Sequence, residues 1–169
     1  VSLVGISLQQ AGRQPADEGW KQLQEHITLV KPTVVFLGYG MASSFENKPE
    51  QFGQDMRALK AAVRKAAGGP IRFVVLSPLR HEHLGGGLPD PSVHNRQLAA
   101  YTKELQTMAA AEGDIFVSLF NADPLVNAKP ALTENGIHPV ASGYARVAAE
   151  ICEQLGVPSH PQLNSPAAA

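Results

Sequence analysis

The chain has 169 residues and a mass of 18.0 kDa, which fits one domain built around a single hydrophobic core. Its net charge of -1 and its pI of about 6.6 disfavour nucleic-acid binding, which usually needs a basic face. A single cysteine, Cys152, excludes an internal disulfide and a cysteine-rich zinc site, and no apolar run reaches the roughly 18–20 residues of a membrane span. These features favour a small molecule or a neutral polymer as partner.

Four short apolar blocks predict strands that are buried on both faces, because each is rich in Val, Ile, Leu or Phe and lacks polar alternation. In chain order they are Val1–Gly5, Thr33–Tyr39, Ile71–Ser77 and Ile115–Leu119. Between and after them, apolar residues recur at helical spacing and predict helices over Asp17–Leu29, Pro49–Ala67, Ser92–Glu112 and Ala141–Leu155. This alternation predicts an α/β fold with a parallel sheet of at least four strands and helices on both sides.

We expect one domain over residues 1–158 and a loose tail, rich in Pro, Ser and Ala, over residues 159–169. Three of the predicted helices have a clear apolar stripe that should face the core. The stripes are Phe52, Met56, Leu59 and Val63; Leu98, Tyr101, Leu105 and Met108; and Tyr144, Val147, Ala148 and Ile151.

In parallel sheets the chemistry lies beyond the carboxyl ends of the strands. The segments that follow those ends are Gly5–Gln10, Gly40–Glu46, Ser77–Pro91 and Asn121–Pro139, and they hold most of the unusual residues. We therefore expect Gly5, Ser7, Gly40 and His138 to converge at this rim, with His81 and Glu82 on the same side.

His138 is the first candidate for catalysis, in the segment TENGIHP over residues 133–139. It directly precedes a predicted helix, where a histidine can be partly exposed. An acidic or amide side chain three or four residues earlier, Asn135 or Glu134, can fold back to Nδ1 and fix the tautomer, as the third member of a catalytic triad does. The alternative is that Asn135 and Gly136 form only a tight turn and His138 is a surface residue.

Two glycine-containing strand exits are the next candidates. Gly40 follows a predicted strand, so its backbone can approach a ligand closely and N–H groups there can face an oxyanion. Ala42 stands where a catalytic loop would normally offer a side-chain donor such as Asn. Gly5-Ile6-Ser7 follows the first predicted strand and could present Ser7 as a nucleophile with His138 as its base. The alternatives are a plain strand-to-helix turn and an ordinary loop serine.

His81, Glu82 and His83 form a third candidate group. In an extended segment, side chains two residues apart project to one side, so the two histidines could ligate a metal. No third ligand accompanies them, and the pattern differs from the helical HExxH motif. We expect this segment to form the wall of a pocket, with no bound metal and no cofactor.

Taken together, these blocks resemble the SGNH (GDSL-type) hydrolase family, particularly its carbohydrate-esterase-like bacterial members, from about Glu18 to Leu155. The resemblance is carried by residues 31–40 leading into Ser44-Phe45, by residues 76–82, and by residues 132–139 with Gly143-Tyr144. It implies a flavodoxin-like three-layer α/β/α sandwich with a parallel sheet of four to five strands. It also implies hydrolysis of an acyl or acetyl ester through a serine acyl-enzyme, and it favours a secreted or periplasmic location over a cytoplasmic one.

The chain departs from the family at its first and third sequence blocks, which are degenerate or missing. Ala42 replaces the Asn that donates to the oxyanion, and Asn135 replaces the orienting Asp, with Glu134 beside it. The segment GISL over residues 5–8 fits two alternatives. Either it is the first block, with Ser7 as nucleophile, or it is the second, in which Gly5 donates an N–H to the oxyanion and the nucleophile lies upstream of the chain. Spacing favours the second alternative, and completeness of the sheet favours the first.

Two functions follow. The leading one is an SGNH-type esterase acting on an acyl or acetyl ester, such as one on a carbohydrate. In this function, Ser7 or an upstream serine attacks the ester. His138 relays the proton, Glu134 or Asn135 orients the His138 ring, and Gly5 and Gly40 line the oxyanion hole. The alternative is a catalytically degenerate protein that binds a ligand or partner without turnover. The missing Asn donor could cost about 10²–10³ in rate and an amide in place of the orienting acid up to about 10⁴. A nucleotide-binding domain is disfavoured because no GxGxxG motif follows a strand.

Overall fold

The computed structural model describes residues 18–158. The predicted strand Val1–Gly5, the candidate residues Gly5 and Ser7, and the predicted tail 159–169 lie outside these residues. The helices are α2 (Glu18–Val30), α3 (Pro49–Ala67), α4 (Ser92–Glu112), α5 (Asp123–Val126) and α6 (Ala141–Gln154), with a 3-10 helix η1 (Ser43–Glu46). The strands are β1 (Val34–Gly38), β2 (Arg72–Leu76) and β3 (Ile115–Val117). None of the described helices combines the length and the apolar character needed to cross a membrane.

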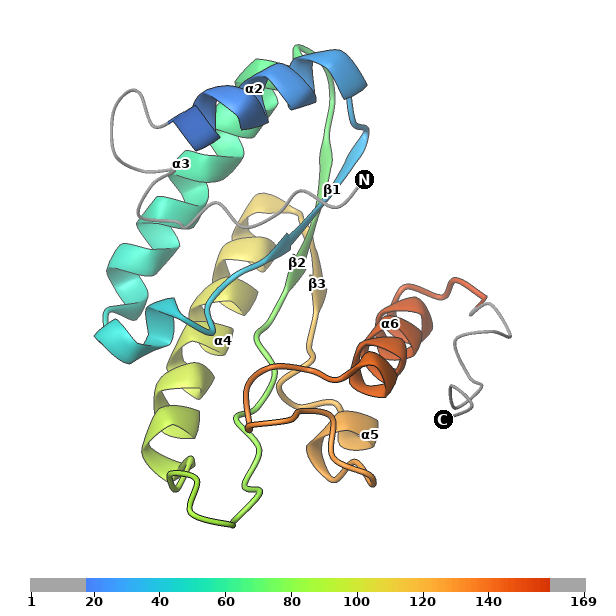
Figure 1. Ribbon diagram of the computed structural model, residues 1–169. Coiled ribbons are helices and arrows are strands. Elements are labelled where there is room, and N and C mark those ends of the chain that lie inside the picture. The colour runs from blue at the N-terminus through green and yellow to red at the C-terminus, as the bar shows by residue number, and fades with distance from the viewer. Residues whose placement is uncertain (1–17, 159–169) are drawn as a thin grey trace.

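The three strands form one parallel sheet in the order β1-β2-β3 (Figure 1). In its register Phe36 lies beside Val74, and Val74 lies beside Ile115. The predicted parallel α/β architecture is therefore confirmed. The predicted number of four to five strands is not, because the described part of the chain contributes only three. The fourth predicted strand, Val1–Gly5, falls outside it.

Helices cover both faces of the sheet and make three layers (Figure 1). On one face, Leu37, Phe73 and Val75 pack against the apolar stripes of α3 and α4, and α2 contributes Ile27. On the other face, Val74 and Val117 pack with side chains of α5 and α6. The stripes predicted for α3 and α4 are fully buried, as expected for helices that lie across a sheet.

Two burial expectations are wrong. The strand β1 is not buried on both faces, because Val34 is 45% exposed and Phe36 is 52% exposed. Within residues 18–158, the core on that face joins α5 and α6 to β2 and β3, and none of its residues covers β1. Tyr144 is 63% exposed instead of facing the core, because α6 packs through Gly143, which approaches the backbone of Leu132 too closely to leave room for a Cβ.

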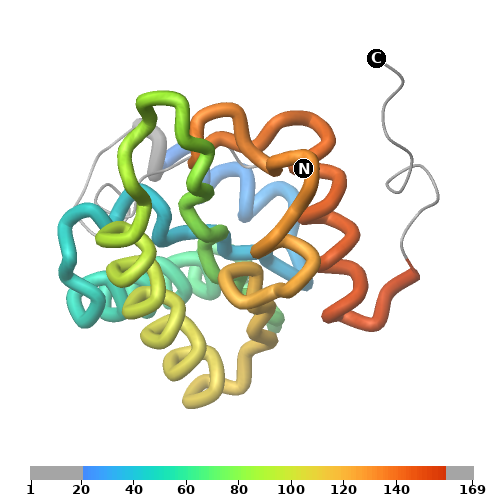
Figure 2. Tube along the Cα trace, turned by 90° about the horizontal axis from the view of Figure 1, so that it is seen from below, coloured from blue at the N-terminus to red at the C-terminus, as the bar shows by residue number. Residues whose placement is uncertain are grey.

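All three strands end at the same edge of the sheet, and Figure 2 looks onto that end of the molecule. The Ser77 hydroxyl joins the exits of β2 and β3. Its oxygen accepts hydrogen bonds from the backbone N–H groups of Leu119 (2.8 Å) and Phe120 (2.9 Å). These two hydrogen bonds hold the segments that leave β2 and β3 next to each other.

A buried ion pair joins α3 to the end of α4. The ammonium group of Lys60 has no solvent exposure and contacts the carboxylates of Glu112 and Asp114. Asp114 is itself almost fully buried, and Arg64 lies 3.8 Å from its second oxygen. A buried carboxylate that loses its partner is destabilising, since its desolvation is no longer offset.

Replacing the buried lysine should therefore destabilise the fold. We expect Lys60→Met to lower the free energy of unfolding by about 3 kcal/mol, because Asp114 would remain buried with only the more distant Arg64 as counter-charge. Lys65→Met, on the exposed face of the same helix, is the matched control and should change it by less than about 0.5 kcal/mol. Urea unfolding curves measure both, and equal effects of the two variants would contradict the prediction.

Candidate functional site

The loop that carries His138 is closed by its own backbone. Thr133 and Pro139 form an antiparallel bridge, and the N–H of Glu134 donates to the His138 carbonyl (3.0 Å). The N–H of Val140 then donates to the carbonyl of Leu132 (2.9 Å), directly before α6 begins. This closure places His138 at the surface beside Asn135, as the three-residue spacing predicts.

In the contact between Asn135 and His138, the side-chain amide of Asn135 is the hydrogen-bond donor. Asn135 Oδ1 accepts hydrogen bonds from the backbone N–H groups of Ile137 (3.2 Å) and His138 (2.9 Å), which defines the orientation of its amide. Its Nδ2 lies 2.8 Å from His138 Nδ1. An amide nitrogen can only donate, so Nδ1 accepts and the proton of the neutral ring lies on Nε2. In a Ser-His-Asp triad the carboxylate accepts from Nδ1–H and leaves Nε2 free to take a proton.

Neither Glu134 nor Ala42 adds a hydrogen-bonding group to the pair of Asn135 and His138. Glu134 is exposed, and within residues 18–158 its carboxylate makes no hydrogen bond to His138. Ala42 is also exposed, directly before η1, and its methyl group supplies no donor. Gly40 is buried at the exit of β1 with a φ of 119°, and a Cβ there would lie 3.5 Å from Pro78.

Glu82 anchors the His138 loop to the exit of β2. Its carboxylate accepts hydrogen bonds from the N–H groups of Leu132 (2.9 Å) and Thr133 (2.7 Å) and from the Thr133 hydroxyl. Its own N–H donates to the Gly136 carbonyl (2.9 Å). Glu82 lies at the rim as predicted, and in this geometry it positions the loop.

His81 belongs to a buried polar chain that the sequence did not predict. Its Nδ1 lies 3.0 Å from Nδ1 of His94, whose Nε2 lies 2.7 Å from the Ser44 hydroxyl oxygen. The Phe45 ring stacks on His94, with centroids 3.8 Å apart and planes inclined by 19°. His94 lies four and seven residues before Leu98 and Tyr101, on the buried stripe of α4, and this spacing is the signal that could have identified it.

These contacts connect the separate loops of the rim. The N–H of Ser44 donates to the Gly40 carbonyl (2.9 Å), and a Cβ on Gly136 would lie 2.7 Å from the His81 ring. Gly40, His81, Glu82 and the His138 loop are thus joined through a continuous series of contacts. The positions of Gly5 and Ser7 lie outside the described residues.

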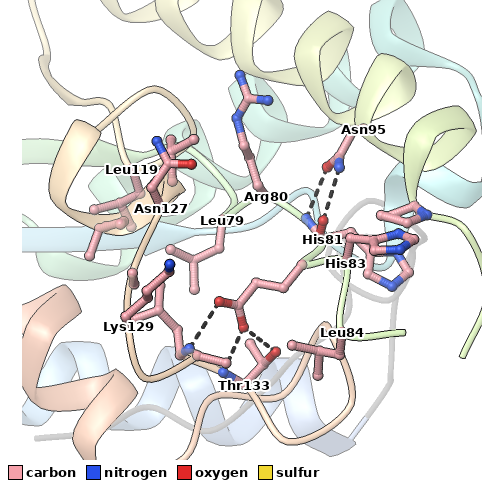
Figure 3. Close-up of a pocket in the computed structure, with 17 residues that line it drawn as sticks. Leu79, Arg80, His81, His83, Leu84, Asn95, Leu119, Asn127, Lys129 and Thr133 are labelled. Atoms are coloured by element: carbon pink, nitrogen blue, oxygen red, sulfur yellow. Dashed lines mark hydrogen bonds between the residues drawn. The ribbon is translucent and has the colours of Figure 1, made fainter. Parts of the chain in front are cut away.

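A cavity of about 410 Å³ lies beside this rim, between residues 79–84 and residues 125–133 (Figure 3). Its wall combines leucines with the polar side chains of Arg80, Lys129 and Asn127. The Asn95 side chain borders it and makes two hydrogen bonds of 2.9 Å to the backbone of His81. No three His, Cys, Asp or Glu side chains among residues 18–158 are grouped so that they could hold a metal ion.

Burial makes the histidine pair less basic. Desolvation lowers the pKa of His81. Desolvation also lowers the pKa of His94, as does the charge of His81, and a hydrogen bond to the Met41 carbonyl opposes this in part. Both rings are therefore neutral at pH 7.

The chain shares its fold with solved structures of hydrolases. A catalytic mutant of the acetylxylan esterase Axe2 from Geobacillus stearothermophilus matches with a TM-score of 0.61 and 17% identity, over 83% of this chain and 68% of that chain. TesA matches with a TM-score of 0.58 and 19% identity, over 81% of this chain and 69% of that one. No family model and no curated protein matches the chain. At this level of identity the likeness shows an SGNH-like fold.

Gly136 should tolerate no side chain. Its φ is 91°, and a Cβ would lie 2.7 Å from His81 Nε2 and 2.9 Å from the Glu82 carbonyl oxygen. We expect Gly136→Ala to lower the free energy of unfolding by about 2–4 kcal/mol, through backbone strain and overpacking. Gly86→Ala is the matched control, since Gly86 also has a positive φ but nothing within 4 Å, and it should cost about 1 kcal/mol. Equal losses in urea unfolding would show that the contact with His81 is unimportant.

Acid should destabilise the fold through the histidine pair. Because the pKa values of His81 and His94 are lowered in the folded chain, the unfolded chain binds protons more readily below about pH 6.5. The stability from this pair is complete above that pH and is lost as the pH falls through the folded-state pKa values. Urea unfolding from about pH 7.5 to 5 should show this loss, and a His81→Gln/His94→Gln double variant should lose less. An identical pH dependence in both proteins would contradict the prediction.

Proposed function

We propose that the chain is an SGNH-type hydrolase, a single domain over residues 1–158, that acts on an acyl or acetyl ester such as one on a carbohydrate. The observation that carries this proposal is the hydrogen-bonded pair of Asn135 and His138, three residues apart at the rim of an SGNH-like fold. In Axe2, two catalytic mutants replace an aspartate and a histidine that are also three positions apart. The cavity beside the rim, which His81 and Glu82 line but Asn135 and His138 do not, offers space for a small-molecule or carbohydrate ester.

In this proposal the chemistry is acyl transfer to a serine. Ser7, or a serine outside this chain, attacks the ester carbonyl, and a rim histidine takes the proton from its hydroxyl. The backbone at Gly5 and Gly40 would stabilise the oxyanion. Support comes from the position of Gly40, which is buried at the end of β1 and joined through Ser44 to the histidine chain.

One observation favours a second function, binding of an ester or carbohydrate without turnover. The Asn135 amide donates to His138 Nδ1, so the neutral ring carries its proton on Nε2 and cannot accept one there. In a serine protease, the corresponding change from Asp to Asn lowers kcat about 10⁴-fold, because it selects the wrong tautomer. Ala42 would lower the rate further, since it cannot donate to an oxyanion.

Restoring the carboxylate separates these two functions. We expect Asn135→Asp to raise kcat by about 10²–10⁴-fold, because a carboxylate would accept both backbone N–H groups and the His138 Nδ1–H. Hydrolysis of p-nitrophenyl acetate and of acetylated xylo-oligosaccharides measures the gain, and a fluorophosphonate probe identifies the serine. Ala42→Asn should also raise kcat, by about 10²-fold, with little effect on KM.

Asn121→Asp is the matched control, since it adds the same charge at an exposed position after β3 and should leave kcat unchanged. If Asn135→Asp folds normally and still binds an acetylated oligosaccharide, but neither it nor the unmodified chain hydrolyses an ester, the binding function is correct.

A further inference from the structure

We propose that the cavity beside the rim binds the carboxylate of a sugar acid, with the guanidinium group of Arg80 as its ligand and the ammonium group of Lys129 as a second cation. The proposal deepens the proposed hydrolase function, on which it rests for the link to an ester, by naming an acidic sugar as the recognised part of the substrate. Its structural basis, the charge and the free donors of the cavity wall, is independent of hydrolysis.

The guanidinium group of Arg80 is held in place while its terminal donors stay free. Its Nε–H donates to the Phe120 carbonyl (3.0 Å), and its central carbon lies 4.5 Å from the centroid of the Phe120 ring. Within residues 18–158, no carboxylate pairs with Arg80, and its two terminal nitrogens make no hydrogen bond. A guanidinium group held through Nε presents its terminal N–H groups as a fork, and a planar carboxylate matches the spacing of that fork.

Lys129 supplies a second cation to the cavity wall. Its side chain is exposed and pairs with no carboxylate in the described part of the chain. The backbone that carries it is fixed by Arg146, whose guanidinium nitrogens donate to the carbonyls of Pro130 (3.0 Å) and Lys129 (3.2 Å). The ammonium group can therefore move on its flexible stem while its point of attachment stays in place.

The acidic residue of the cavity wall, Glu82, does not neutralise Arg80 at close range. Its carboxylate accepts three hydrogen bonds from Leu132 and Thr133. Figure 3 shows Arg80 and Thr133 at opposite ends of the cavity. With neutral histidines, the two cations and one anion of the wall leave it a formal charge of +1. An anionic group beside Arg80 thus meets a free cation in a partly enclosed site, where the attraction is stronger than in bulk water.

The rest of the cavity suits a hydroxylated ring. Its volume of about 410 Å³ is in the usual range for small-molecule sites. The Asn127 amide makes no hydrogen bond within residues 18–158 and can bond to sugar hydroxyls, while Leu79 and Leu119 offer apolar surface to the C–H groups of the ring. Thr133 lines the cavity and begins the loop that carries His138, so a sugar bound here borders the candidate catalytic pair.

Titration of the ¹⁵N-labelled chain tests the site directly by NMR. We expect sodium glucuronate to shift the Arg80 Nε–H signal and the backbone signals of residues 79–84 and 125–133. Glucuronamide, which has the same ring without the charge, should bind at least about 10-fold more weakly. Added NaCl should weaken the binding of glucuronate. Equal affinities for the two compounds, or no shifts in the cavity up to the solubility limit of glucuronate, would overturn the proposal.

Inorganic phosphate and acetate distinguish a sugar acid from other sources of an anion. Glucuronate should bind more tightly than either, because the contacts of its ring add to those of its carboxylate. If phosphate binds more tightly than glucuronate, the cavity is a phosphate site and the assignment to a sugar acid is wrong. If acetate binds as tightly as glucuronate, the ring is not recognised and the assignment is wrong as well.

Substitutions in the cavity wall test the role of each cation. Arg80→Gln should weaken glucuronate binding at least about 10-fold, and Arg80→Lys should recover only part of it, since an ammonium group cannot form two parallel hydrogen bonds. Lys129→Glu should also weaken binding, and its exposed, unpaired side chain makes it a safe variant for folding. Arg72→Gln, at the opposite end of β2, is the matched control and should keep the original affinity. Full affinity in Arg80→Gln, or in Lys129→Glu if Arg80→Gln does not fold, would overturn the proposal.

These binding measurements need no hydrolysis, so this inference and the proposed function can fail separately. In an active chain, Arg80→Gln should raise KM at least about 10-fold for an acetylated oligosaccharide that carries glucuronate, with little change in kcat, because the contact is equal in the ground state and the transition state. If the chain hydrolyses esters but does not bind glucuronate, this inference fails alone. If glucuronate binds but neither the unmodified chain nor Asn135→Asp hydrolyses an ester, the hydrolase function fails and the cavity remains a site for a sugar acid.

Discussion

The carboxylate of Glu82 is the interaction on which the site and one layer of the fold depend. It collects hydrogen bonds from the backbone of Leu132 and Thr133 and from the Thr133 hydroxyl, and charge-assisted bonds of this kind are among the strongest in proteins. The segment it holds leads through the His138 loop directly into α6, which packs on Leu132 at Gly143. One side chain at the exit of β2 therefore positions both the loop and the helix that covers the second face.

The chemistry of the rim depends on the direction of its hydrogen bonds more than on its residue types. His138 and His81 are both imidazoles within one group of loops, yet their partners differ. An amide N–H on Nδ1 leaves the proton of His138 on Nε2, whereas Nδ1 of His81 faces Nδ1 of a second imidazole, His94, at 3.0 Å. The same residue type thus has different hydrogen-bond partners at the two positions.

The likeness to Axe2 and TesA concerns the fold, and the fold alone does not carry an activity. The departures lie at two positions where the polarity of a single group matters. Ala42 offers no donor, and Asn135 offers a donor where a triad needs an acceptor.

Much of the architecture could be predicted from the sequence because its signals are local. Pro49–Ala67 and Ser92–Glu112 were predicted as helices with the bounds observed, since each has a continuous apolar stripe and ends at a glycine with positive φ. The contact between Asn135 and His138 could be predicted for the same reason, because three residues of chain bring the two side chains together.

Only the tertiary structure decided the rest. Ser44 and His94 are 50 residues apart, and no local pattern indicates that they share a hydrogen bond. The exposed face of β1 likewise depends on where α6 packs, and the polarity of the Asn135 amide depends on which backbone groups reach its oxygen. Periodicity is a property of neighbouring residues, whereas the direction of a hydrogen bond is set by the partners that the fold brings to it.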